Sequence, residues 1–154
     1  MSEDNPFPPA DADRHAIWEL LIRRDSVFFL AGDWTAVVDD YLAEGFVGID
    51  AGGSADPARW RIGFPRLDAY RDAAIAGRLD PAEFAEDLRA AWFRCQSLET
   101  IEIAGELALA HKRIAGRSAR RDGGALELGW RSIFMLRRID GAWKITGFIG
   151  YLPP

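Results

Sequence analysis

Hydrophobic residues in the first part of the chain recur with a helical period. Over residues 13–31 they are spaced three and four apart, and Ile17, Leu21 and Phe28 fall on one arc of a helical wheel. Gly32 follows directly, and glycine commonly ends a helix because it accepts positive φ. The pattern predicts one long amphipathic helix that buries a single face.

The middle of the chain shows shorter and less regular patterns. Apolar spacing, proline positions and glycine-rich stretches divide it into brief segments. They predict a helix over residues 34–42, a strand over 46–49, a loop over 51–57, a helix over 67–76, and a helix from Pro81 to Ala91.

The last third of the chain has the alternation typical of strands. Residues 97–104 and 107–114 flank Gly105-Glu106, and a longer pair within residues 130–151 flanks Asp140-Gly141. Two-residue turns of this kind close antiparallel hairpins. Helices followed by a meander of strands predict an α+β fold, with N-terminal helices packed on a strongly curved antiparallel sheet.

The terminal hairpin predicts an aromatic inner face. Counting outward from the turn pairs Ile139 with Ala142 and Leu136 with Ile145. Alternation puts every second pair on one side of the sheet, and the pair of Leu136 with Ile145 lies on the inner face. The predicted pairs further along this face are Phe134 with Gly147, Ser132 with Ile149, and Trp130 with Tyr151.

The first hairpin predicts an inner face by the same counting. It pairs Ile103 with Ala108, Ile101 with Ala110 and Glu99 with Lys112, and this apolar side should point inward. His111, opposite Thr100, then points outward as a surface or dimer-contact histidine rather than a catalytic base.

The opposite face of the sheet carries large apolar groups that the helices do not need. Monomers rarely expose such a patch, so we expect a homodimer through this face. The predicted contacts are Leu107, Leu109, His111, Ile133, Met135 and Phe148.

Asp25 interrupts the apolar arc of the long helix. A carboxylate in that place must be paired, hydrogen-bonded or protonated, because burial without a partner is costly. One interpretation is a structural ion pair with Arg24 or a strand arginine. The other is a polar group that faces a ligand pocket.

Composition narrows the classes of function. The 154 residues are 49% hydrophobic, with six Trp and nine Phe, which suits one domain over residues 11–154 with a cavity lined by rings. Residues 1–10 are rich in proline and acidic groups and predict a flexible tail. The formal charge of −5, with scattered basic residues, argues against a nucleic-acid partner.

The chain lacks several other signatures. It has no apolar run of membrane-spanning length and no signal peptide, so we expect a cytoplasmic protein with no membrane partner. Cys95 is the only cysteine, and two isolated histidines offer no dense ligand set, so we expect neither a metal nor another cofactor.

Three short motifs together resemble the nuclear transport factor 2-like superfamily, of the SnoaL-like kind. They are Ala31-Gly32-Asp33-Trp34, residues 103–108 and residues 140–145. The resemblance covers most of residues 13–152, with residues 55–92 the least typical. It implies a cone in which helices and a curved sheet enclose a pocket, and dimerisation through the sheet.

The resemblance also implies site residues. Ketosteroid isomerase and scytalone dehydratase in this superfamily use a pocket tyrosine eight residues before the aspartate of the Gly-Asp motif. Here that position holds Asp25. The catalytic aspartate of the isomerase follows the first strand, and Asp50 lies within one residue of that place. Asp25 and Asp50 are therefore the candidate catalytic residues.

Two classes of function follow. The protein is a cofactor-free acid/base enzyme of isomerase, cyclase or dehydratase type, acting on a small apolar or carbonyl-containing metabolite, or it is a non-catalytic ligand-binding or homodimerisation module. Several polar groups converging in an apolar cavity would favour the enzyme. The expected ligand-binding residues are Trp18, Phe29, Trp130, Ser132, Phe134 and Tyr151.

Overall fold

The long N-terminal helix forms where the hydrophobic period predicts it. The computed structural model describes residues 3–154. The Asp11 carboxylate accepts a hydrogen bond from the backbone N–H of Arg14 and caps the helix start, and Gly32 ends it at a φ of 72°. The helix has three consecutive parts: α1 (Ala12–Trp18), a π-helical turn (Glu19–Arg24) and α2 (Asp25–Ala31).

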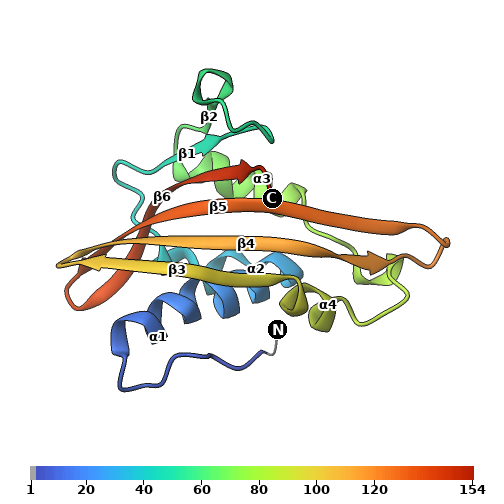
Figure 1. The fold of residues 1–154 in the computed structure, drawn as a ribbon, viewed down its shortest axis with the longest axis horizontal. Coiled ribbons are helices and arrows are strands. Elements are labelled where there is room, and N and C mark those ends of the chain that lie inside the picture. The colour runs from blue at the N-terminus through green and yellow to red at the C-terminus, as the bar shows by residue number, and fades with distance from the viewer. Residues whose placement is uncertain (1–2) are drawn as a thin grey trace.

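Six strands form one sheet against this helix. Their order across the sheet is β2-β1-β6-β5-β4-β3. Figure 1 shows the four long strands β3 to β6 as one bent layer, with α1 and α2 along one of its faces. The strands are β1 (Val47–Asp50), β2 (Arg61–Phe64), β3 (Gln96–Ala104), β4 (Leu107–Ala119), β5 (Ala125–Ile139) and β6 (Ala142–Leu152).

The α+β prediction is confirmed, with one correction to the sheet. β1 runs parallel to β6, so the sheet is mixed rather than wholly antiparallel. The chain reaches β1 through an isolated parallel bridge between Tyr41 and Ile145, and so enters the sheet in the direction of β6. β2 was not predicted, because residues 51–60 carry strong loop signals and Arg61–Phe64 is only four residues long.

The register of the first hairpin agrees with the prediction near its turn. Ile101 pairs with Ala110, Ile103 with Ala108, and His111 with Thr100 on the outward side. A bulge between Leu98 and Thr100 then changes the pairing, so Lys112 faces Leu98 and not Glu99. An extra residue of this kind has no clear mark in the sequence.

The terminal hairpin departs from its predicted register beyond Leu136. Leu136 pairs with Ile145 as predicted, and Thr146 then forms a bulge whose hydroxyl donates to the carbonyl of Met135. The pairs predicted beyond it, Phe134 with Gly147, Ser132 with Ile149 and Trp130 with Tyr151, are therefore wrong. Phe134 instead faces Phe148.

The bulge also reverses the side on which Phe148 lies. One extra residue moves every later side chain to the other face of a strand. Phe148 is only 4% exposed and lies in the core, so its predicted place in a dimer contact is wrong.

Two predicted helices are broken into shorter pieces. Residues 34–42 form 3₁₀ turns at Trp34–Ala36 and Val38–Asp40, because the β-branched run there is a poor helix former. The region from Pro81 to Ala91 forms a 3₁₀ turn at Pro81–Glu83, and Asp87 then caps a separate helix. The remaining helices are α3 (Leu67–Ala76), as predicted, and α4 (Leu88–Arg94).

Residues 3–10 lie against the N-terminal helix. The side-chain amide of Asn5 donates to the carbonyl of His15 and to Glu19, and Phe7 packs on the core. Glu3 accepts from Arg89 of α4. No helix within residues 3–154 is long and apolar enough to cross a membrane.

We expect Gly147→Ala to destabilise the protein by about 1–3 kcal/mol, the usual cost of forcing extra atoms into a packed site. A Cβ at Gly147 would collide with the backbone carbonyl of Val47, where β1 pairs with β6. Urea unfolding measures the effect. Gly129→Ala is the control, because a Cβ there meets only Pro154 at 3.7 Å. Equal stability of the two variants would contradict close packing at Gly147.

Candidate functional site

The centre of the candidate site is an irregular turn in the N-terminal helix. In a regular α-helix the backbone N–H of Asp25 would donate to the carbonyl of Leu21. Here it reaches the carbonyl of Leu20, as a π turn requires. The Leu21 carbonyl is free to accept from Lys112 of β4, at 2.7 Å. Single π turns often occur at functional sites.

Lys112 also forms an ion pair with Asp25. Its Nζ lies 2.8 Å from Asp25 Oδ2, and the lysine side chain is only 3% exposed. The partner of Asp25 is thus a strand lysine, not Arg24 or a strand arginine as the sequence suggested. Arg24 instead pairs with Asp40 at 2.7 Å.

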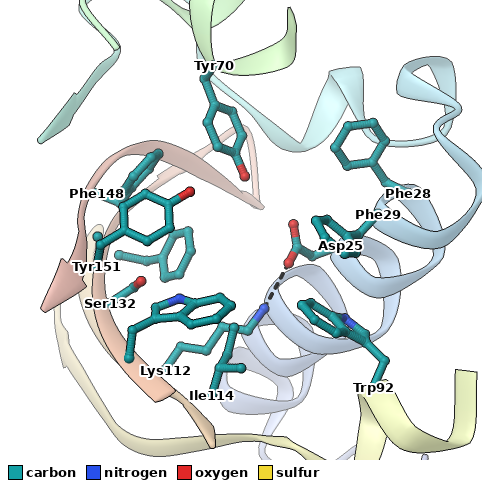
Figure 2. Close-up of a pocket in the computed structure, with 13 residues that line it drawn as sticks. Asp25, Phe28, Phe29, Tyr70, Trp92, Lys112, Ile114, Ser132, Phe148 and Tyr151 are labelled. Atoms are coloured by element: carbon teal, nitrogen blue, oxygen red, sulfur yellow. Dashed lines mark hydrogen bonds and ion pairs between the residues drawn. The ribbon is translucent and has the colours of Figure 1, made fainter. Parts of the chain in front are cut away.

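The ion pair lies on the wall of an internal cavity of about 90 Å³. Figure 2 shows Asp25 reaching in from the helix and Lys112 from the sheet. Most of the remaining wall is aromatic. Phe29 and Trp92 close one side as a parallel stack with ring centres 4.4 Å apart. The sheet contributes Ile114, Trp130, Ser132, Phe134, Phe148, Gly150 and Tyr151, and the helices add Phe28 and Tyr70.

A second space of about 220 Å³ adjoins the inner cavity. The two share four wall residues, namely Phe29, Tyr70, Trp130 and Tyr151. Ala73 and Ala74 of α3, with Gly77 directly after it, line the outer space, where their small size leaves room. Together the two spaces amount to roughly 300 Å³, the lower end of the range for small-molecule sites.

Hydroxyl groups supply further polar atoms of the cavity. Figure 2 shows the Tyr70 hydroxyl pointing toward Asp25, with Tyr151 and Ser132 facing in from the sheet. Burial raises the pKa of the Tyr70 phenol well above its usual value, and the negative charge of Asp25 raises it further. Tyr70 therefore stays protonated and can donate a hydrogen bond.

The structure brings most of the residues expected from sequence to one place. Asp25, Phe29, Trp130, Ser132, Phe134 and Tyr151 all line the inner cavity. Asp50 does not, because its carboxylate accepts from Arg61 at 3.0 Å and from the backbone N–H of Gly52 at 2.8 Å.

Trp18 also lies away from the cavity. It is fully buried against Ile22 and Phe93. A regular helix would place Trp18 on the same face as Asp25. The π turn between them adds a residue to the turn and rotates Trp18 away from that face.

Sequence reasoning missed Lys112, Tyr70, Trp92 and Phe148 as site residues. Lys112 was placed on the inner face without a role. One signal could have singled it out, because Lys112 and Lys144 are the only lysines among the 19 basic residues of the chain. Within residues 3–154, no three His, Cys, Asp or Glu side chains gather in a way that could hold a metal ion.

The arrangement suits a molecule that is mainly apolar and has one polar end. Aromatic walls would hold its body by dispersion and ring contacts. Lys112 and Tyr70 can donate hydrogen bonds to an oxygen atom, and Asp25 can accept a proton beside them.

Comparison with solved structures identifies the fold. The chain resembles a conserved protein from Planctomyces limnophilus DSM 3776 with a TM-score of 0.63 and 17% identity, over 90% of this chain and 94% of that one. It resembles an NTF2-like protein of unknown function from Shewanella baltica OS155 with a TM-score of 0.58 and 16% identity, over 94% and 96% of the two chains.

A third structure carries a functional description. It is a putative aromatic ring hydroxylase from Novosphingobium aromaticivorans, with a TM-score of 0.54 and 17% identity over 91% of this chain and 88% of that one. No protein-family model and no curated protein matches the sequence. At these identities the comparisons show the nuclear transport factor 2-like fold alone, as the resemblance implied.

We expect Asp25→Asn to destabilise the protein by about 2–4 kcal/mol, because it leaves the Lys112 ammonium buried without its counter-charge. Chemical unfolding at neutral pH measures the change. A double variant, Asp25→Leu with Lys112→Met, should recover most of the loss, since replacing a buried pair with apolar groups is often neutral.

Asp50→Asn provides the matched control. Its partner Arg61 is 77% exposed, so the change should be below about 1 kcal/mol. Equal losses in Asp25→Asn and Asp50→Asn would show that the Asp25–Lys112 pair does not stabilise the fold.

Proposed function

We propose that the cavity binds a small, mainly apolar molecule with a carbonyl group and promotes proton transfer at the carbon beside it, without a cofactor. The observation that carries this proposal is the Asp25–Lys112 pair at the wall of an aromatic cavity. A carboxylate beside a cation and neutral phenols is a suitable set for acid/base work.

Each polar group has a distinct role in this proposal. Asp25 takes the proton from the carbon acid. Lys112 and the Tyr70 hydroxyl donate to the carbonyl oxygen as it gains negative charge. The phenol is suited to this because its raised pKa keeps its proton in place. Isomerisation, cyclisation or dehydration of a carbonyl compound can begin with this step.

We expect the protein to speed hydrogen–deuterium exchange beside the carbonyl of 2-tetralone, a bicyclic ketone, followed by proton NMR in D₂O. Asp25→Asn should lower the rate by about 100-fold or more, the usual contribution of a positioned base. Asp50→Asn should keep the wild-type rate, because Asp50 lies outside the cavity wall.

Failure of this test has a defined meaning. Shifts in the protein NMR signals of the cavity residues with no faster exchange would favour the non-catalytic binding module. An Asp50→Asn loss as large as that of Asp25→Asn would contradict the assignment of Asp25 as the base.

A second proposal concerns the outer face of the sheet. We propose that two copies of the chain pair there, because residues of β3 to β6 line a mainly apolar groove of about 490 Å³, with Leu107 60% and Leu109 40% exposed. Met135 lines the same groove, and Ile133 pairs with His111 on that side of the sheet. Identical apolar grooves can cover each other in a two-fold arrangement.

Sedimentation equilibrium at micromolar concentration should give the mass of a dimer, and Leu109→Lys should give a monomer, since a charge would be buried in the interface. Ile62→Lys is the control, because Ile62 is 65% exposed on β2, away from the groove. A monomeric wild type, or equal dissociation in both variants, would contradict the proposal.

A further inference from the structure

Lysine is rare in this chain, and one of its two copies is in the cavity. Lys112 and Lys144 stand among 19 basic residues, and all the others are arginines. A site that needed only a cation to pair with Asp25 could use arginine, whose planar group matches a carboxylate well. Lysine offers something that arginine does not: its amine can lose a proton and attack a carbonyl carbon.

The position of the Lys112 amine suits this chemistry. Its Nζ has a proton acceptor, Asp25 Oδ2, at 2.8 Å and a fixed anchor, the Leu21 carbonyl, at 2.7 Å. An ammonium group has three N–H directions, and these contacts use two of them. Because Lys112 is part of the cavity wall, the amine is within reach of a bound molecule.

We propose that Lys112 is a nucleophile that forms a Schiff base with an aromatic aldehyde or ketone bound in the cavity. This deepens the proposed function and rests on it, since it requires the same cavity to bind a carbonyl compound. The aromatic walls, including Trp130 and Tyr151, would hold the rings of such a molecule.

The step begins with a proton transfer from the Lys112 ammonium to Asp25. A ligand that fills the cavity removes water and makes two separate charges more costly, which favours the neutral amine and acid. The amine can keep its hydrogen bond to Leu21 while rotation about the Cε–Nζ bond turns its lone pair toward the ligand.

The amine then forms a C–N bond to the carbonyl carbon, and one N–H proton moves to the oxygen to give a carbinolamine. Asp25 returns its proton to that hydroxyl, which leaves as water. The products are a protonated imine, one water molecule and the Asp25 carboxylate. The charge and the atoms balance, and no oxidant or reductant takes part.

The test uses the wild-type protein with 2-naphthaldehyde as the probe. Cyanoborohydride reduces an imine to a stable secondary amine, and peptide mass mapping locates it. We expect Lys112 to be labelled at least about tenfold faster than Lys144, because only Lys112 combines an apolar site with a proton acceptor. Lys144 is the internal control, and the map also separates the chain's terminal amine.

Two variants make the result specific. Lys112→Arg keeps a cation but cannot form an imine, so the label at position 112 should be lost. Tryptophan fluorescence follows the binding of 2-naphthaldehyde to the wild type. Asp25→Asn keeps the amine but removes the proton acceptor, so labelling of Lys112 should slow by about tenfold or more. 2-Naphthol, which has no carbonyl, should protect Lys112 by competition.

The outcomes separate the two proposals. Binding of 2-naphthaldehyde with Lys112 labelled no faster than Lys144 would overturn the Schiff-base assignment and leave the proposed function standing. No detectable binding of either 2-naphthaldehyde or 2-tetralone to the wild type would count against both. The wild-type comparison needs no variant, so it decides the matter even if Lys112→Arg fails to fold.

Discussion

The buried ammonium of Lys112 is the constraint on which the rest of the structure depends. The lysine side chain extends from the sheet to the helix and is only 3% exposed. Burying its charge there without a partner would destabilise the fold by several kcal/mol. The helix provides two acceptors for its hydrogen bonds, the Asp25 carboxylate and the Leu21 carbonyl. The π turn makes the second available, so a local irregularity of the helix follows from the need to satisfy the lysine.

The cavity follows from how the sheet meets this helix. The bulge at Thr146 turns Phe148 inward, so that Phe148 and Phe134 face each other across the strands. Tyr70 and Phe148 then pack with ring centres 5.1 Å apart. These rings line the inner cavity and leave it unfilled. The polar groups of the site are therefore set among aromatic rings, and a low-polarity environment of this kind strengthens electrostatic interactions.

Much of the fold was predictable because its signals are local. The two-residue turns fix the pairs nearest to them, such as Ile139 with Ala142 and Ala104 with Leu107. The helical period located the N-terminal helix, and its break at Asp25 marked a residue of the cavity wall. These features depend on residues that are close in sequence.

What could not be predicted depends on irregularities or on distant contacts. A bulge adds one residue without a sequence signal. The bulge at Thr146 moved Phe148 to the inside, and the bulge between Leu98 and Thr100 changed the partner of Lys112. The π turn shifted the helical phase and took Trp18 away from the cavity. Tyr70 and Trp92 belong to helices in the region where the patterns are weakest, so nothing local connects them to Asp25.

The Asp25–Lys112 ion pair can serve stability, chemistry or both, and the residue types at the two positions help to distinguish these roles. An ion pair kept only for stability could be replaced by apolar side chains of similar volume at little cost. Here the pair stands in a chain that otherwise uses arginine almost throughout, and both groups lie on a cavity wall. A lysine beside a carboxylate on a cavity wall places a hydrogen-bond donor and an acceptor where a bound molecule can contact both, which a packed core does not need and acid/base chemistry does.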